Sequence, residues 1–207
     1  MAGALHRSSP FSLLLMDFRG HGDSGPGPVT FGFRETQEIQ AALDLAASDP
    51  HLKGLPVGCW GVSMGGAVAL LAAARTPRIL GVAVDGAYSD VGKAIARAQW
   101  LTYHIPRVPL GQWVIWAVEL RLRCKMMALD PFRVMDRIRP RPVLLIHGGR
   151  DKSIPPEEGE ALYRAAGDPK GWWLIPEAEH ATCFYDRREE YVKKITEFFQ
   201  DAFLRAA

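Results

Sequence analysis

The chain alternates between short runs that are apolar throughout and longer segments whose apolar residues recur every three or four positions. The short runs lie at residues 11–18, 55–62, 79–86, 141–149 and 171–178. A run of this length without polar interruptions is typical of a strand that is buried on both faces. The five runs therefore predict five strands of a sheet that helices cover on both sides.

Helical periodicity fills most of the intervals between these runs. It occurs at residues 34–48, 63–75, 155–167 and 186–206. In the first of these segments Ile39, Leu43 and Ala46 share one face, which predicts an amphipathic helix. The second is almost entirely small and apolar, so we expect it to be buried. Strands that alternate with helices indicate a parallel sheet, and a length of 207 residues fits a single α/β domain.

Residues 87–140 break this rhythm. They contain four prolines and helical pieces, but no clear strand. Their large apolar residues include Trp100, Tyr103, Trp113, Trp116, Met126 and Met127. Two interpretations stay open, namely a small helical cap over a pocket and a pair of ordinary packing helices.

One junction between a run and a helix carries a chemical signature. The sequence "GVSMG" places Ser63 between Gly61 and Gly65, where a strand must turn sharply into a helix. Glycine at both positions is expected to remove collisions with neighbouring backbone in so tight a turn. The turn lifts the serine hydroxyl above the carboxyl edge of the sheet, and the backbone N–H of Met64 becomes a candidate oxyanion donor.

A serine hydroxyl is a weak nucleophile that needs a base, and the base needs an orienting acid. Asp151 lies in the loop after the fourth run, and His180 lies in the loop after the fifth. The carboxyl ends of parallel strands share one rim, so both side chains should approach Ser63 there. The order Ser, Asp, His along the chain suits this architecture. We therefore predict a catalytic triad of Ser63, Asp151 and His180.

A family resemblance rests on four motifs that occur in a fixed order along the chain. They are "DFRGHGDSG", "GVSMGG", "PVLLIHGGRDKSIPP" and "PEAEHATCF". The chain resembles the α/β-hydrolase superfamily, close to its serine-aminopeptidase-like and esterase branch. The resemblance implies the α/β-hydrolase fold, and it implies that Asp17 and His21 are structural. It also implies that His147 supports the acid loop. Asp85 stays an alternative acid, because some members of the family carry the acid after that earlier strand.

The resemblance also leaves a gap at the start of the chain. Related enzymes have further strands before the "LLLMDF" run, and one of them ends in an "HG" turn that supplies a second oxyanion amide. Only ten residues precede residue 11 here. A truncated or mis-started reading frame is one explanation, and a minimal variant that pairs the two remaining strands directly is the other. Either leaves the source of the second donor open.

The charge and the cysteine content of the chain limit the kinds of partner and compartment that the sequence predicts. The net charge is +2 and the charges are scattered, which gives no footprint for nucleic acid or an acidic membrane. The basic run "RLRCK" at 121–125 is interpreted as a solvated helix edge. Three cysteines at unrelated spacings favour a reducing compartment over disulfides or zinc. No run is long enough to span a membrane and no secretory leader is evident, so we expect a cytoplasmic protein.

The sequence thus predicts a cofactor-free serine hydrolase, carboxylesterase-like, that cleaves a small-molecule ester or an amide through an acyl-enzyme. No metal-ligand spacing or dinucleotide motif points elsewhere. The alternative is an inactive α/β-hydrolase-like module. A dehalogenase or epoxide hydrolase of the same fold is disfavoured, because those enzymes place Asp where this chain has Ser63. The substrate and the oligomeric state cannot be predicted from the sequence.

Overall fold

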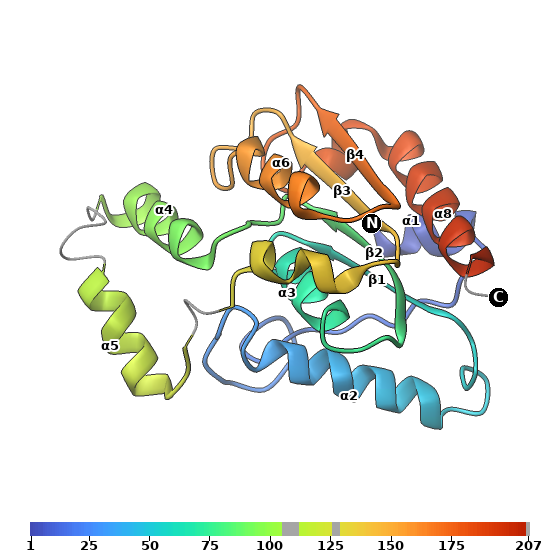
Figure 1. The fold of residues 1–207 in the computed structure, drawn as a ribbon, viewed down its shortest axis with the longest axis horizontal. Coiled ribbons are helices and arrows are strands. Elements are labelled where there is room, and N and C mark those ends of the chain that lie inside the picture. Colours follow the sequence, from blue (N-terminus) through green and yellow to red (C-terminus); the bar gives the residue numbers. More distant parts are fainter. Residues whose placement is uncertain (105–111, 126–128, 206–207) are drawn as a thin grey trace.

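A computed structural model describes residues 1–104, 112–125 and 129–205 of the chain. Its centre is a parallel sheet of four strands in the order β1-β2-β3-β4 (Figure 1). The strands are β1 (Val57–Val62), β2 (Ile79–Asp85), β3 (Val143–Gly148) and β4 (Lys170–Ile175). In the register Val62 lies opposite Asp85, and Asp85 lies opposite Ile146. The strands therefore end together, and the loops that follow them meet at one edge of the sheet.

Helices cover both faces of the sheet, as the alternating pattern predicts. One face carries α2 (Glu35–Ser48), α3 (Met64–Ala73), the 3-10 helix η3 (Pro131–Ile138) and α6 (Pro156–Ala165). The other carries α1 (Ala2–Ser8), the short α7 (Cys183–Asp186) and α8 (Arg188–Leu204). Helix α3 is buried along almost its whole length because its small residues let it lie directly on β1 and β2. The predicted parallel α/β sheet flanked by helices is confirmed.

The prediction of a strand at residues 11–18 is wrong for this structure. The segment is not a strand and makes no backbone–backbone hydrogen bonds within residues 11–17 in the described part of the chain. Leu14 and Leu15 are 51% and 69% exposed, so the segment is not buried on both faces either. A strand forms only where a neighbouring strand satisfies its backbone. Among the described residues β1 pairs only with β2, so this run has no such neighbour.

The two ends of this unpaired segment are nevertheless anchored. Phe11 packs edge-on against Phe199 and Phe203 of α8, with ring centroids 6.3 and 5.7 Å apart. Phe18 packs against the core on the opposite face of the sheet. The glycine-rich loop that follows closes on itself, because Asp17 accepts a hydrogen bond from the N–H of Asp23 at 3.1 Å. This contact gives Asp17 a structural role, as the resemblance implies.

Residues 87–140 contain α4 (Val91–Tyr103), α5 (Gln112–Leu122) and η3. Helix η3 packs against α3 and α6 and so belongs to the body of the domain. Helices α4 and α5 instead extend away from the body on the left of Figure 1. Met126 and Met127, which the sequence suggests as part of the cap, lie outside the described residues. Whether α4 and α5 act as a cap stays a prediction.

Candidate active site

Ser63 occupies the turn between β1 and α3 with a strained backbone. Its φ is 55° and its ψ is −122°, a conformation that residues with a side chain rarely adopt. The N–H of Ser63 donates a 2.7 Å hydrogen bond to the carbonyl of Asp85, which continues the pairing of β1 with β2 into the turn. Strain of this kind is concentrated at functional sites, where surrounding contacts hold it in place.

The two motif glycines, Gly61 and Gly65, differ in how much space surrounds them. A Cβ at Gly61 would collide with the backbone of Gly65 and Gly66, so this glycine is required by packing. A Cβ at Gly65 would meet no atom within 4 Å, which contradicts the expectation of a collision there. The crowded position is Gly66, where a Cβ would lie 3.0 Å from the carbonyl oxygen of Gly61 and 3.1 Å from Val84. Removing the side chain at 61 already frees the turn, because the backbone of Gly65 is itself the obstacle.

The structure brings the three predicted triad residues together. His180 Nε2 lies 2.9 Å from Ser63 Oγ, and His180 Nδ1 lies 2.6 Å from Asp151 Oδ2. The Asp151 side chain is only 1% exposed, whereas that of His180 is 26% exposed. The serine and the carboxylate thus lie on opposite sides of the imidazole ring, within hydrogen-bond reach of its two nitrogens.

The carboxylate of Asp151 is fixed by its own loop. Its Oδ1 accepts hydrogen bonds from the N–H groups of Ser153 and Ile154 at 2.9 and 2.7 Å, which leaves Oδ2 for His180. The hydrogen bond that His180 donates to Asp151 raises the pKa of His180, against a smaller opposing effect of burial. Asp151 therefore favours a protonated imidazole, which is the form that would be produced if a serine gave it a proton.

His147 supports this loop rather than the serine. Its ring is buried, and Nε2 donates a 2.8 Å hydrogen bond to the carbonyl of Ile154 while lying 3.7 Å from Asp151 Oδ2. Gly86, which the sequence analysis did not single out, lies next to the hydrogen bond between His180 and Asp151. A Cβ there would lie 3.5 Å from both Asp151 Oδ2 and His180 Nδ1, and its φ is +62°. Its position at the end of the apolar run 79–86, where β2 meets the carboxyl edge of the sheet, is the feature of the sequence that could have indicated it.

Asp85, the alternative acid, has different partners. It is completely buried at the end of β2, and its Oδ2 accepts a 3.1 Å hydrogen bond from the hydroxyl of Tyr191. That hydroxyl in turn accepts a 3.2 Å hydrogen bond from Trp60 Nε1. Burial raises the pKa of Asp85, and contacts with Cys183 and Tyr191 partly offset the shift. Asp151, not Asp85, is the carboxylate hydrogen-bonded to His180 in this structure.

Beside the serine lies an apolar cluster that the sequence did not reveal. Met64, Phe31 and Ile95 are partly buried in it, against a core that includes Tyr88 and Ile154. The three partly buried residues come from the elbow, the loop before α2 and α4. Their convergence depends on the fold, so no local pattern could have shown it. Through Met64, the residue that follows Ser63, the cluster adjoins the turn that carries the candidate nucleophile.

Phe31 is held by a buried carboxylate. Its φ is +53°, and Glu35 accepts hydrogen bonds from the N–H and hydroxyl of Thr30, both at 2.6 Å, and from the N–H of Gly32 at 2.8 Å. These hydrogen bonds lower the pKa of Glu35 although burial opposes them. The residues on either side of Phe31 are therefore both tied to the carboxylate of Glu35.

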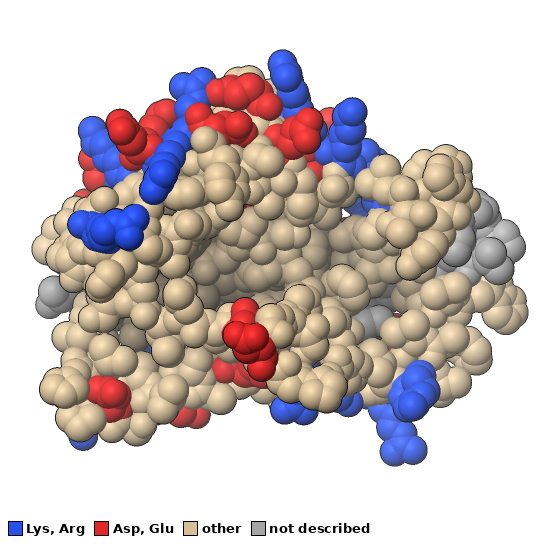
Figure 2. Space-filling model, turned by 180° about the vertical axis from the view of Figure 1, so that it is seen from behind, with Lys and Arg blue, Asp and Glu red and all other residues tan. Residues whose placement is uncertain are grey.

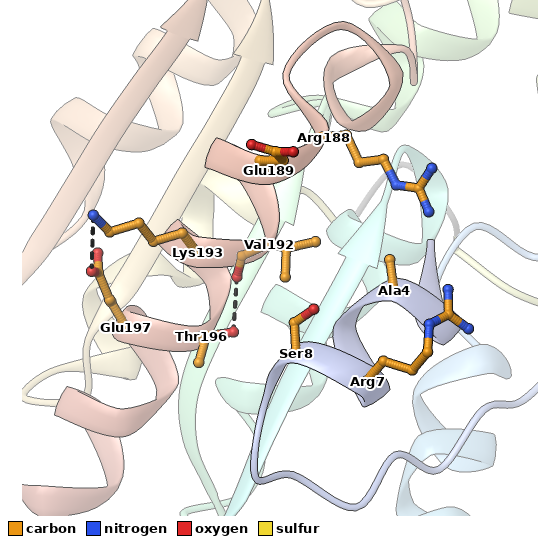
Figure 3. Close-up of a pocket in the computed structure, with 9 residues that line it drawn as sticks. All are labelled: Ala4, Arg7, Ser8, Arg188, Glu189, Val192, Lys193, Thr196 and Glu197. Carbon is orange, nitrogen blue, oxygen red and sulfur yellow. Dashed lines mark hydrogen bonds and ion pairs between the residues drawn. The ribbon is translucent and has the colours of Figure 1, made fainter.

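A separate surface cavity of about 470 Å³ lies between α1 and α8 (Figure 3). Its walls carry charges of both signs, including Arg7, Arg188 and an ion pair of Lys193 with Glu197 at 3.8 Å. None of the three triad candidates lines it. Within the described ranges, no group of three or more His, Cys, Asp or Glu side chains is arranged to hold a metal ion.

The chain is an α/β protein in which Ser63, His180 and Asp151 meet at the carboxyl edge of the sheet. The family described as "Alpha/beta hydrolase family" matches residues 1–194. The chain belongs to this family.

The chain is also similar to curated relatives and to solved structures. The Bacillus subtilis protein YqkD is 29% identical over 199 residues, which cover 92% of this chain and 63% of YqkD. Protein bem46 of Schizosaccharomyces pombe is 22% identical over 204 residues, covering 97% of this chain and 62% of bem46. The chain thus spans less than two thirds of the length of these relatives. A structure of the Pyrococcus furiosus esterase Pf2001 is similar in fold, with a TM-score of 0.71 and 23% identity over 90% of this chain and 69% of that one.

Proposed function

We propose that the chain is a serine hydrolase that cleaves a carboxylic ester, or less readily an amide, through an acyl-enzyme. The observation that carries the proposal is the pair of hydrogen bonds through His180, 2.9 Å to Ser63 Oγ and 2.6 Å to Asp151 Oδ2. A hydroxyl, an imidazole and a buried carboxylate in this order are the groups that activate a serine for acyl transfer.

In the first half of the proposed reaction, Ser63 Oγ attacks the carbonyl carbon of the substrate. His180 Nε2 takes the hydroxyl proton as the new C–O bond forms, and Asp151 stabilises the resulting imidazolium without accepting the proton. The carbonyl electrons move onto the oxygen. The N–H of Met64, in the first turn of α3, has no acceptor within the helix and is the proposed donor to that oxyanion.

In the second half, the tetrahedral intermediate collapses and its C–O bond to the leaving group breaks. The imidazolium of His180 gives its proton to the departing alcohol, and an acyl group stays on Ser63. Water then attacks the acyl carbon while His180 again accepts a proton, and collapse returns that proton to Ser63 as the acid leaves. No cofactor enters either half.

The apolar cluster around Met64 suggests which substrates fit. Phe31 and Ile95 pack in the same cluster as Met64, the residue that follows Ser63, so the proposal favours an acyl or alcohol group that is at least partly apolar. The similar structure from Pyrococcus furiosus is that of an esterase, which agrees with the preference for esters. No described residue is assigned as the second oxyanion donor. This observation favours a second candidate function, that of a family member that folds but does not hydrolyse a substrate.

A fluorophosphonate probe separates the two candidates. We expect the probe to label the chain on Ser63 and the chain to hydrolyse p-nitrophenyl acetate, and Ser63→Ala should lose both. Ser48→Ala is the matched control, because Ser48 is exposed on α2 and hydrogen-bonds only to the carbonyl of Leu45. A folded chain that never labels would establish the inactive candidate, and labelling at another serine would move the nucleophile.

A further inference from the structure

The helices α4 and α5 expose more aromatic surface than a water-facing unit requires. Three tryptophans and a tyrosine are involved, Trp100, Tyr103, Trp113 and Trp116, each more than half exposed. In α5 only Ile115 is buried, so that helix presents apolar side chains around most of its circumference. A helix that is apolar on most sides is normally enclosed by other elements. Exposed apolar patches of this kind mark contact surfaces.

We propose that the unit formed by α4 and α5 docks on the surface of an anionic lipid bilayer. Tryptophan and tyrosine suit the headgroup region, because their rings are apolar and their N–H or O–H groups still find hydrogen-bond partners. Among the described residues no helix is long and apolar enough to cross a membrane. The proposed contact is therefore one in which the unit lies on the bilayer surface.

The charge of this unit points to an anionic surface. Residues 91–104 and 112–125 contain five lysines and arginines but a single acidic residue, Glu119. Lys93 is already paired with Glu158 at 3.7 Å. Arg121, Arg123 and Lys125, at the end of α5 and just beyond it, are exposed. The net charge of +2 for the whole chain conceals this local excess, because acidic residues elsewhere offset it.

The same charge argues against a second copy as the occupant. Two such units face to face would bring their basic residues together, and like charges oppose association. An anionic bilayer instead attracts basic residues close to its surface. In Figure 2 the right-hand part of the molecule, where α4 and α5 lie in this turned view, is mainly uncharged and has basic side chains at its lower edge. Uncharged surface bordered by basic residues is the arrangement that interfacial helices use.

The position of the unit links docking to the candidate active site. Helix α4 begins at Val91, only six residues after Asp85 ends β2, so it starts at the carboxyl edge of the sheet. Ala94 and Ile95 of α4 pack in the same apolar cluster as Met64, the residue after the candidate nucleophile. A bilayer bound to α4 and α5 would therefore lie near the site. Docking itself does not depend on the proposed hydrolase chemistry.

Vesicle sedimentation tests the proposal with the full chain. We expect the chain to bind vesicles of phosphatidylcholine with phosphatidylglycerol at least about tenfold more tightly than vesicles of phosphatidylcholine alone, and to lose binding as salt rises. Arg121→Gln with Arg123→Gln should weaken binding about tenfold or more. Trp113→Ala with Trp116→Ala should weaken binding to both kinds of vesicle. Circular dichroism and the melting temperature check that each variant folds.

Two controls make the outcome decisive. Tyr185→Ala removes a comparably exposed aromatic side chain that belongs to α7 and not to this unit, and should leave binding unchanged. Ser63→Ala should also bind normally, so loss of hydrolysis and loss of docking are distinguishable. The proposal is overturned by absent vesicle binding, or by binding that the tryptophan variants do not affect. Self-association that the tryptophan variants abolish, without vesicle binding, would identify a second copy as the occupant instead.

Discussion

The carboxyl edge of the sheet and the outer side of β1 satisfy their polar groups very differently. At the carboxyl edge Asp151 accepts two backbone hydrogen bonds in addition to that with His180. On the outer side of β1, which among the described residues pairs only with β2, residues 11–17 make no backbone–backbone hydrogen bonds and Leu15 is 69% exposed. The triad candidates come from loops after β1, β3 and β4, so their geometry is complete without that segment. Site geometry and sheet completeness are therefore separable in this fold.

The largest expected effect separates the two buried carboxylates near the site. Asp151→Asn should lower kcat for p-nitrophenyl acetate by about 10⁴, because an amide favours the wrong tautomer of His180. Asp85→Asn is the matched control and should cost far less, because Asp85 contacts Tyr191 rather than His180. Steady-state kinetics and the rate of fluorophosphonate labelling measure both. The opposite ranking would make Asp85 the acid.

The next effect concerns the two glycines of the elbow. Gly61→Ala should destabilise the fold by about 2–4 kcal/mol or prevent folding, since the added Cβ collides with the backbone of Gly65. Gly65→Ala should retain or slightly raise stability, because the site is open and alanine favours a helix by about 1 kcal/mol over glycine. Urea unfolding gives both values. Equal losses at the two positions would contradict the geometry described for the turn.

A moderate effect is expected in the pH dependence. The proposed hydrolysis needs neutral His180. The hydrogen bond that His180 donates to Asp151 raises the pKa of His180, so kcat/KM should fall as pH drops through a pKa above about 6.5. Asp151→Asn should move this limb to lower pH. The stability that the raised pKa contributes is present below about pH 6.5 and is lost as pH rises through the folded-state pKa. An acidic limb unchanged in the variant would argue against this coupling.

The smallest effect on catalysis is expected on the outer side of β1. Unpaired strand edges and exposed leucines favour association with other chains. We expect the 207-residue chain to self-associate with rising concentration, and Leu15→Lys to weaken this while changing kcat less than about twofold. Analytical ultracentrifugation measures the first and ester hydrolysis the second. Leu45→Lys, at a comparably exposed leucine on α2, is the control. A wild-type chain that stays monomeric and melts cooperatively would refute the expectation.

The parts of the fold that follow from local sequence were predictable, and those that depend on distant neighbours were not. Four apolar runs become strands because helices and other strands cover them. The strand-to-helix turn at Ser63 is marked in the sequence by Gly61 and Gly65. The run at 11–18 has the same composition, yet it is no strand here, since pairing depends on a neighbour rather than on the run itself. Gly65 matches the motif, but only the folded turn shows that Gly66 is the crowded position.

The candidate site divides in the same way. The loops that carry Asp151 and His180 could be assigned to one rim because parallel strands end together, although the catalytic roles stay predictions. The contacts of Tyr191 with Asp85, and of Phe31 with the cluster around Met64, join residues far apart in the sequence. An amphipathic helix pattern predicts that Tyr191 is buried. It does not predict which strand end its hydroxyl reaches.

The hydrogen bonds that link α8 to Ser63 have a consequence for the order in which the molecule should unfold. Tyr191 of α8 donates to the side chain of Asp85, and the carbonyl of Asp85 accepts the N–H of Ser63. Asp85 thus joins α8 to the strained turn. Regions joined in this way open together as one cooperative unit. Detachment of α8 would release the turn while β3 and β4 are still paired. On heating, the arrangement of Ser63 should therefore be lost at a lower temperature than the sheet.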